Sequence, residues 1–223
     1  MTKRNVFKVQ PPSFDREQDL YEKHFEVVVG LDEVGRGALA GPVFACSVFL
    51  GGTSYPYRNI SIKDSKQLSP RARERSYRAL VDQLGEVGDF ALGSATAQEI
   101  DTYGIAPATR MAMVRAVEGM HLHPDAMLID AVSLSELTIY QEAIVRGDQI
   151  SLSIAAASII AKVTRDRLMV DIDSEYPGYG FAGNKGYGSG EHMSALHELG
   201  PSPLHRRSFQ PIRGMLERSH YIV

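Results

Sequence analysis

Cysteine, tryptophan and net charge are all scarce in this sequence. Its 223 residues include one cysteine, Cys46, and no tryptophan. A lone cysteine cannot close a disulfide within the chain, which excludes a disulfide-framed secreted module, and it cannot build a cysteine-based zinc site. The formal net charge of −3 also argues against a protein that holds nucleic acid by bulk positive charge.

Long apolar stretches are absent as well. The two longest, residues 43–50 and 154–161, fall well short of the ~20 residues that a membrane-spanning helix needs. Residues 1–25 contain no apolar run of signal-peptide length. We therefore expect a soluble, cytoplasmic protein with no membrane partner.

What the sequence does contain is an ordinary globular composition, with 43% hydrophobic and 23% charged residues. Residues 1–24 are mostly polar and are interrupted by Pro11 and Pro12, so we predict an N-terminal arm followed by a single domain over residues 25–223.

Apolar patterning predicts a mixture of strands and helices in that domain. The predicted strands cover residues 26–33, 42–50, 90–97, 126–130 and 138–145. One predicted helix begins at Ser69, as an N-cap before Pro70, and others cover 106–120, 153–172 and 191–199. On helix 106–120, Met111, Val114 and Val117 have the spacing of one buried face. This order predicts an α/β layer fold with a mixed sheet.

A glycine-rich segment follows the first predicted strand. Residues 35–40 fit the dinucleotide-binding pattern G-x-G-x-x-A, which a helix should follow. Instead Gly41 and Pro42 lead into a β-rich run, so a dinucleotide site is the weaker interpretation. No Lys-Ser or Lys-Thr pair follows, which argues against a P-loop. Two interpretations remain open: a plain hairpin connection, or a loop whose backbone N–H groups approach a ligand closely.

Four carboxylates stand at the ends of apolar segments. Asp32 and Glu33 end the first strand, Asp130 ends another, and Asp148 precedes the long helix. Neighbouring strand residues point to opposite faces, so Asp32 and Glu33 reach one site only if the strand breaks or kinks there. A like-charge pair about 4 Å apart costs about 4 kcal/mol at an effective dielectric of about 20. A cluster of such acids therefore predicts bound Mg²⁺ or Mn²⁺, as in two-ion sites for phosphoryl transfer. The alternative is that the acids are solvated surface residues.

Five motifs occur in the order seen in a known family. They are VGLDEVGRGALAGPV at 29–43, DSKQL at 64–68, AASIIAKVTRD at 156–166, KGYG at 185–188 and HRRSF at 205–209. Together they resemble the signature of ribonuclease HII, the bacterial type 2 ribonuclease H. The resemblance implies a ribonuclease H-like fold, with a five-stranded mixed sheet flanked by helices and a helical C-terminal portion.

The resemblance also implies a metal site. The family's metal-binding carboxylates match Asp32, Glu33, Asp130 and Asp148, which would hold two Mn²⁺ or Mg²⁺ ions. Asp166 competes for the fourth place, but it lies within a predicted helix, where we expect it to pair with Arg165 or Arg167. The family usually has glycine after the third carboxylate. This chain has Ala131, which is tolerated unless the position needs a positive φ.

The implied substrate contacts come from the same motifs. In the family, a Gly-Arg-Gly loop recognises the ribonucleotide around its 2′-hydroxyl, and a tyrosine packs on the neighbouring deoxyribose. These roles match Gly35, Arg36, Gly37 and Tyr187. The remaining candidates would hold the phosphate backbone without reading sequence. They are Ser65, Lys66, Lys162, Thr164, Arg165, Lys185, Arg206, Arg207 and Ser208.

The implied activity is that of an endoribonuclease acting in ribonucleotide excision repair. It would hydrolyse the phosphodiester 5′ to a ribonucleotide, in RNA–DNA hybrids and at single ribonucleotides in duplex DNA, by two-metal-ion catalysis that leaves a 3′-hydroxyl and a 5′-phosphate. No obligate protein partner is inferred.

Three alternatives can be told apart. Type 3 ribonuclease H shares the chemistry but carries an N-terminal substrate-binding domain, for which residues 1–24 are too few. A non-catalytic nucleic-acid-binding module would bind without Mg²⁺-dependent cutting. A dinucleotide enzyme would be stabilised against heat by NAD.

Overall fold

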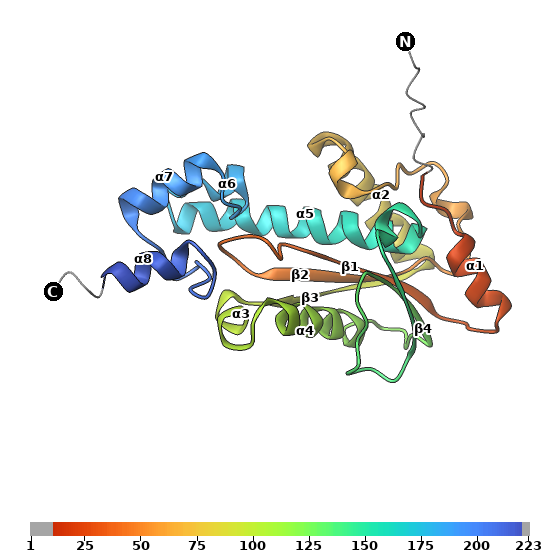
Figure 1. Ribbon diagram of the computed structural model, residues 1–223. Coiled ribbons are helices and arrows are strands. Elements are labelled where there is room, and N and C mark those ends of the chain that lie inside the picture. The colour runs from red at the N-terminus through yellow and green to blue at the C-terminus, as the bar shows by residue number, and fades with distance from the viewer. Residues whose placement is uncertain (1–10, 220–223) are drawn as a thin grey trace, which may run out of the picture.

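A five-stranded mixed sheet forms the centre of the computed structural model, which describes residues 11–219 (Figure 1). The strand order is β3-β2-β1-β4-β5. The strands are β1 (Val28–Val34), β2 (Val43–Phe49), β3 (Asp89–Ala95), β4 (Ala126–Asp130) and β5 (Tyr140–Ile144). β1, β2 and β3 pair antiparallel, whereas β1, β4 and β5 pair parallel. The predicted fold class is confirmed.

Helices cover both faces of the sheet and extend beyond one end of it. α2 and α5 lie on one face, α3 and α4 lie on the other, and α6 to α8 gather at the end of α5 (Figure 1). The helices are α1 (Asp15–Glu22), α2 (Pro70–Val87), α3 (Ala97–Tyr103), α4 (Ile105–Glu118), α5 (Leu152–Glu175), α6 (Phe181–Asn184), α7 (Gly190–Leu199) and α8 (Ile212–Ser219). Short 3-10 turns cover Tyr55–Tyr57, Ser65–Gln67 and Gly147–Gln149. No helix in the described range is long and apolar enough to cross a membrane.

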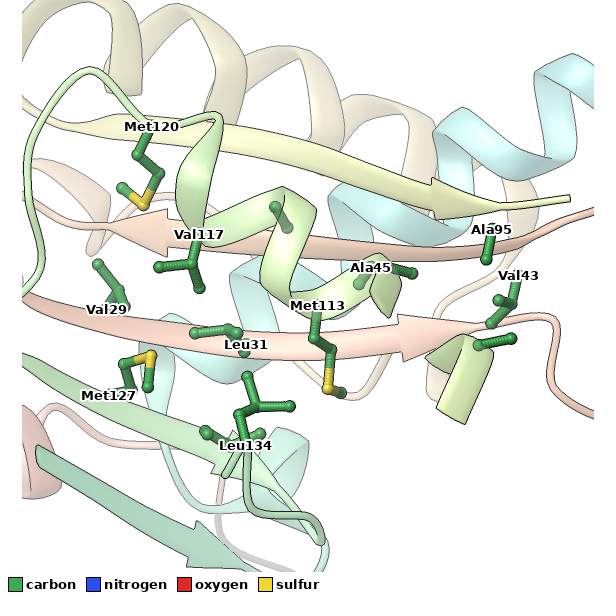
Figure 2. Close-up of a cluster of buried hydrophobic side chains, with 14 of the residues drawn as sticks. Val29, Leu31, Val43, Ala45, Ala95, Met113, Val117, Met120, Met127 and Leu134 are labelled. Carbon is green, nitrogen blue, oxygen red and sulfur yellow. The ribbon is translucent and has the colours of Figure 1, made fainter. Parts of the chain in front are cut away.

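Alternation along β2 shows how one sheet supplies two cores. Val43 and Ala45 belong to the cluster under α4, together with Met113 (Figure 2). Cys46 and Val48 belong to a second cluster with side chains of α2 and α5. Because both faces are buried, the strand is an almost continuous apolar run, which is why it was predictable from sequence.

The buried face of α4 overlaps only in part with the predicted one. Of the three predicted residues, Val117 is buried as expected, Met111 and Val114 are only half-buried, and Ala112 is buried as well. The small residues bring the helix close to the sheet: a Cβ added at Gly93 of β3 would lie 2.0 Å from the carbonyl oxygen of Ala112. Close packing selects small side chains, so the spacing of the larger apolar residues was misleading.

α5 lies against β1 and is buried for most of its length. A Cβ added at Gly30 of β1 would come within 2.3 Å of the backbone nitrogen of Ile154, so the helix and strand are in direct contact. Ser151 caps the helix by accepting a hydrogen bond from the Ile154 N–H at 3.2 Å. The close approach brings Ser158 of α5 within hydrogen-bonding reach of Asp32.

The described part of the predicted arm includes α1, whose Glu17 is buried. Oε1 of Glu17 accepts hydrogen bonds from Ser151 Oγ at 2.5 Å, Ser153 N at 2.8 Å and Ser153 Oγ at 2.5 Å. These contacts anchor α1 at the N-terminus of α5, where a negative charge is favoured. Residues 1–10 of the arm lie outside the described residues.

Candidate active site

Three carboxylates meet where β1 and β4 end. One oxygen from each of Asp32, Glu33 and Asp130 lies within 4.8 Å of the others. The expected kink in β1 is absent, because its ladder with β2 continues through Val34. Its ladder with β4 ends earlier, at Leu31. Both acidic residues of β1 therefore lie just past the point where β4 stops pairing, next to Asp130.

These carboxylates are poorly suited to carry charge without a counterion. Burial, followed by the charge of Glu33, raises the pKa of Asp32 well above its ordinary value. Burial also raises the pKa of Glu33, although Arg36 opposes the shift. Oε1 of Glu33 accepts a hydrogen bond from Arg36 Nη1 at 3.1 Å, while Oε2 is buried with no partner among the described residues. An unpartnered buried oxygen beside two further carboxylates fits Mg²⁺ or Mn²⁺.

Asp148 lies beside this cluster but outside its tightest group. It sits on the turn Gly147–Gln149, whose Gly147 N–H donates to Oδ1 of Asp130 at 2.7 Å. Burial, then the charges of Asp64 and Asp130, raises the pKa of Asp148 to about 6. The structure thus brings the four predicted carboxylates into one region, with Asp148 at its edge.

Asp64 is a carboxylate of this region that the sequence interpretation did not assign. Its Oδ1 accepts a hydrogen bond from Lys66 N at 2.9 Å, and its Oδ2 accepts from the amides of Gln67 and Gln149 at 3.3 Å. Its charge is one of the causes that raise the pKa of Asp148. The sequence offered one indication that Asp64 belongs to this region, because Asp64 is the first residue of the DSKQL motif. Asp64 therefore fixes the backbone of the turn that carries Lys66 and ties it to Gln149, the residue after Asp148.

Ala131, directly after Asp130, has a φ of +57°. This left-handed conformation favours glycine, so alanine is strained at this position. The strain is on the order of 1 kcal/mol. The Ala131 N–H donates to the carbonyl of Ile144 at 3.0 Å, which holds the residue in place at the end of β4. Asp130 keeps its position in the carboxylate cluster despite this strain.

The two glycines of the Gly-Arg-Gly loop serve different needs. Gly35 has a φ of +92°, and a Cβ there would lie 2.3 Å from Nε of Arg165. The fold therefore requires glycine at this position. Gly37 is exposed, and a Cβ there would meet nothing within 4 Å. The fold does not require this second glycine, but a bare backbone suits close approach by a ligand.

Arg206 lies beneath this loop and is fully buried. Its guanidinium donates hydrogen bonds to the carbonyls of Gly41 at 3.0 Å, Arg36 at 2.8 Å and Gly35 at 2.7 Å. Burial, then the charge of Arg165, lowers the pKa of Arg206 to about 9. The expected contact with a phosphate at the surface does not fit this burial. Arg206 instead holds the loop in shape from below.

Arg165 is a second buried arginine, and it also differs from expectation. It donates to the carbonyls of Pro42 at 2.9 Å, Lys185 at 2.9 Å and Ala40 at 3.2 Å. It therefore joins the glycine loop to the KGYG motif and does not face a phosphate.

The expected partner of Asp166 is also wrong. Asp166 pairs with Lys162 at 2.7 Å and with Arg73 at 3.6 Å. Arg167 pairs with Glu74 at 2.7 Å instead. Asp166 is thus engaged with cations of α2 and α5 and lies outside the carboxylate cluster.

Tyr187 lies next to the glycine loop and is half-buried. Its ring centroid is 5.7 Å from Nζ of Lys162 and 5.5 Å from Cζ of Arg165. The Leu39 N–H donates to the carbonyl of Gly186 at 2.8 Å. These contacts make the glycine loop and the KGYG motif one continuous surface.

Two other predicted contacts, Lys66 and Arg207, have exposed side chains and can take up a phosphate oxygen. Oγ1 of Thr164 has no partner among the described residues, but it is buried and does not reach the surface where a phosphate would bind.

The other predicted contacts already have partners within the protein. Nζ of Lys185 donates to the carbonyl of Ala182. Oγ of Ser65 accepts from Ser158 at 3.0 Å. Oγ of Ser208 donates to Asp101 at 2.6 Å, and Asp101 also accepts from the backbone N–H groups of Arg207 and Ser208. Asp101 of α3 was not predicted and fixes this segment.

Comparison with known proteins places these features in context. The family model described as Ribonuclease HII matches residues 29–212. A Ribonuclease HII from Chloroflexus aurantiacus is 49% identical over 203 residues, covering 90% of this chain and 94% of that protein.

Solved structures agree with the sequence comparisons. The ribonuclease H2 of Pyrococcus horikoshii superposes with a TM-score of 0.73 at 26% identity, covering 87% of this chain and 99% of that chain. Bst-RNase HIII in complex with Mn²⁺ has a TM-score of 0.63 at 19% identity, covering 87% of this chain and 70% of that chain, and shares the fold.

Proposed function

The chain belongs to the ribonuclease HII family and is a nuclease of the hydrolase class, and from this premise we propose that it cuts the phosphodiester 5′ to a ribonucleotide. The family implies action on RNA paired with DNA. The finer proposal is that the chain also acts at a single ribonucleotide within duplex DNA. The products would be a 3′-hydroxyl and a 5′-phosphate.

The observation that carries this proposal is the double role of Glu33. Its Oε1 accepts a hydrogen bond from Arg36 in the Gly-Arg-Gly loop, while its buried Oε2 is unpartnered beside Asp32 and Asp130. One side chain therefore connects the loop proposed to bind the ribose to the carboxylates proposed to bind metal. A ribonucleotide held by the loop would have its phosphate next to the carboxylate cluster.

We assign the metal-holding role to Asp32, Glu33 and Asp130, with Asp148 completing the set. When bound, two Mg²⁺ or Mn²⁺ ions would supply the charge that activates a water molecule and stabilises the departing 3′-oxygen. The chain orients its own ligands for this task. The Glu33 N–H donates to Oδ1 of Asp32 at 2.7 Å, and the Gly147 N–H donates to Oδ1 of Asp130 at 2.7 Å. Such second contacts fix which oxygens face the ions.

Sugar recognition would fall on the loop backbone. The groups around Gly35, Arg36 and Gly37 would hydrogen-bond to the 2′-hydroxyl, which distinguishes RNA from DNA. A site built to bind a hydroxyl can reject a substrate that lacks it by about 10⁴-fold. Tyr187 would pack on the deoxyribose that follows. The two contacts together favour a ribose–deoxyribose junction.

The net charge of −3 is consistent with this division of labour. Part of the acidic charge is concentrated in the carboxylate cluster, where bound cations would offset it. Lys66 and Arg207 would supply local phosphate contacts, which add affinity and salt sensitivity without reading sequence. Specificity would then depend on the sugar.

A single gel tests the proposal. A DNA duplex with one ribonucleotide, an RNA–DNA hybrid and an all-DNA duplex are each incubated with Mg²⁺, Mn²⁺ or EDTA. We expect one cut 5′ to the single ribonucleotide, cleavage of the hybrid, no cleavage of all-DNA, and none with EDTA. A cut on the 3′ side, or binding without metal-dependent cutting, contradicts the proposal.

A further inference from the structure

Two buried histidines face each other beside the glycine loop. His192 belongs to α7, and His205 lies in the segment that leads to Arg206. Their side chains are 0% and 1% exposed, and their Nε2 atoms are 3.0 Å apart. Neither residue belongs to the site described above.

The neighbours of the two rings determine where each proton sits. The backbone N–H of Ser202 donates to Nδ1 of His205 at 3.0 Å, so this nitrogen carries no proton. His205 must then carry its proton on Nε2 and donate it to Nε2 of His192. His192 in turn carries its proton on Nδ1 and donates it to the carbonyl of Tyr187 at 2.9 Å. Both rings are neutral, and all four ring nitrogens are used.

The two ends of this hydrogen-bonded chain are the two elements of the proposed sugar site. At one end, the Tyr187 carbonyl is held by His192 and by the Ser189 N–H at 2.8 Å. At the other end, the His205 segment is tied to the glycine loop: the Gly41 N–H donates to the Leu204 carbonyl at 3.0 Å. Arg206 follows directly and holds Gly35 and Arg36 by their carbonyls.

An aromatic cage fixes the planes of both rings. Tyr179 and Phe181 stack on each other with centroids 5.4 Å apart. The His205 ring lies 5.0 Å from Tyr179, and the His192 ring lies edge-on to Phe181 at 5.4 Å. An apolar pair of side chains would fill this space but would leave the Tyr187 carbonyl without its bond from His192. The histidines therefore provide directed hydrogen bonds in addition to filling the space.

We propose that His192 and His205 are positioning residues that set Tyr187 relative to the Gly35–Gly37 loop, and so set the preference for a ribose–deoxyribose junction. This role rests on the proposed function of Tyr187 and the loop. Neither histidine touches the substrate. Loss of the histidine chain should weaken discrimination between substrates more than it weakens cleavage itself.

The test compares three variants with the wild type. His205→Leu removes every hydrogen bond of the ring, to His192 and to the backbone and hydroxyl of Ser202, whereas His205→Gln keeps an N–H donor directed at His192. His197→Gln is the matched control, because His197 is an exposed histidine on α7, the helix that carries His192. The measured quantity is the ratio of kcat/KM on a duplex with one ribonucleotide to kcat/KM on an RNA–DNA hybrid.

We expect His205→Leu to lower this ratio about tenfold, the effect of about one lost hydrogen bond. His205→Gln should retain most of the ratio, and His197→Gln should leave it unchanged. A folded His205→Leu variant with the wild-type ratio overturns the proposal. So does a His205→Leu variant that lowers kcat/KM on both substrates equally.

A second measurement needs no activity. Long-range ¹⁵N NMR of the wild type at pH 7 should show the Nδ1–H form for His192 and the Nε2–H form for His205. The ¹³C shift of the Tyr187 carbonyl should change in His205→Leu, which leaves His192 without its donor, and stay close to the wild-type value in His205→Gln and His197→Gln. Other ring forms overturn the positioning role even if His205→Leu does not fold, and an unmoved carbonyl in a folded His205→Leu variant overturns it as well. If the ring forms hold but the wild type shows no junction preference, the recognition role of Tyr187 fails instead.

Discussion

The guanidinium of Arg206 donates a 2.7 Å hydrogen bond to the carbonyl of Gly35, a residue 171 positions away in the chain. This contact places an arginine of the HRRSF motif under the Gly-Arg-Gly loop. Two further bonds, to Arg36 and Gly41, leave no donor group of Arg206 facing solvent. The shape of the loop therefore depends on a residue that the substrate does not touch.

Arg206→Lys should lower both stability and activity. Lysine lacks the planar fork that reaches three carbonyls, so at least one buried carbonyl loses its partner and the free energy of unfolding falls by about 3 kcal/mol. Urea denaturation measures this change. Arg207→Lys is the control, because the side chain of Arg207 is exposed and its replacement should change stability by less than about 0.5 kcal/mol. Equal stability of the two variants would contradict the supporting role of Arg206.

Ala131→Gly should stabilise the protein. Glycine adopts the observed φ of +57° without strain, which relieves about 1 kcal/mol, while the greater freedom of the unfolded chain costs about 0.5–1 kcal/mol, so the free energy of unfolding should rise by up to about 0.5 kcal/mol. The control is Ala143→Gly, at an exposed position within β5, where the same substitution should destabilise by about 0.5–1 kcal/mol. Opposite signs in urea denaturation are expected, and a loss of stability in both variants would refute the strain.

Asp130→Asn should abolish metal-dependent cleavage while largely sparing duplex binding. The loss of one carboxylate ligand removes several kcal/mol of charge stabilisation, so kcat should fall by about 10³-fold. Mn²⁺ should raise the thermal midpoint of the wild type and raise that of the variant much less, because binding to the folded state stabilises it. Near-normal turnover by Asp130→Asn, or an equal thermal shift, would rule out the metal assignment.

The buried His205 should make the difference in stability between the wild type and His205→Gln depend on pH. Burial, then the neighbouring His192, lowers the pKa of His205 from 6.5 to about 4. The unfolded chain therefore binds the proton more tightly, and the stabilisation present above pH 6.5 is lost as the pH falls toward 4. Relative to His205→Gln, the wild type should lose about 3 kcal/mol across this window.

Comparing the two proteins isolates this contribution, because the carboxylates titrate in both. The groups packed on His205 are His192, Ser202, Tyr179 and Phe181, and Asp101 and Arg207 line the neighbouring cavity. A constant difference between wild type and His205→Gln from pH 4 to 6.5 would mean that His205 is not held neutral.

The salt dependence of binding should distinguish Lys66, a proposed phosphate contact, from a nearby exposed lysine that is not one. Lys66 is exposed, and Lys66→Gln should weaken binding to all duplexes and reduce the slope of log K against log salt by about one. Lys63→Gln, an exposed change three residues away, is the control and should leave the slope unchanged. Duplex-binding constants measured in EDTA between about 50 and about 200 mM salt give the slopes of both variants. An unaltered slope for Lys66→Gln would remove Lys66 from the phosphate contacts.

Much of the fold was predictable from local patterns. The apolar run at 126–130 is β4 with unchanged bounds, and Ser69 caps α2 as predicted, accepting from the Ala72 N–H at 3.3 Å. α3 was missed although Thr96 and Glu99 form a capping box that marks its start. These features depend on residues close in sequence, which is why sequence patterns reveal them.

The sequence by itself determined the strands, the main helices and the motif positions that carry the proposed carboxylates. Only the tertiary structure decided that Arg165 and Arg206 are buried, that Ala131 has a positive φ, and that His192 meets His205. The reason is physical: the partner of a polar side chain is supplied by segments far away in the chain. Periodicity reports whether a residue faces inward, but it cannot report which distant carbonyl, carboxylate or ring that residue will meet.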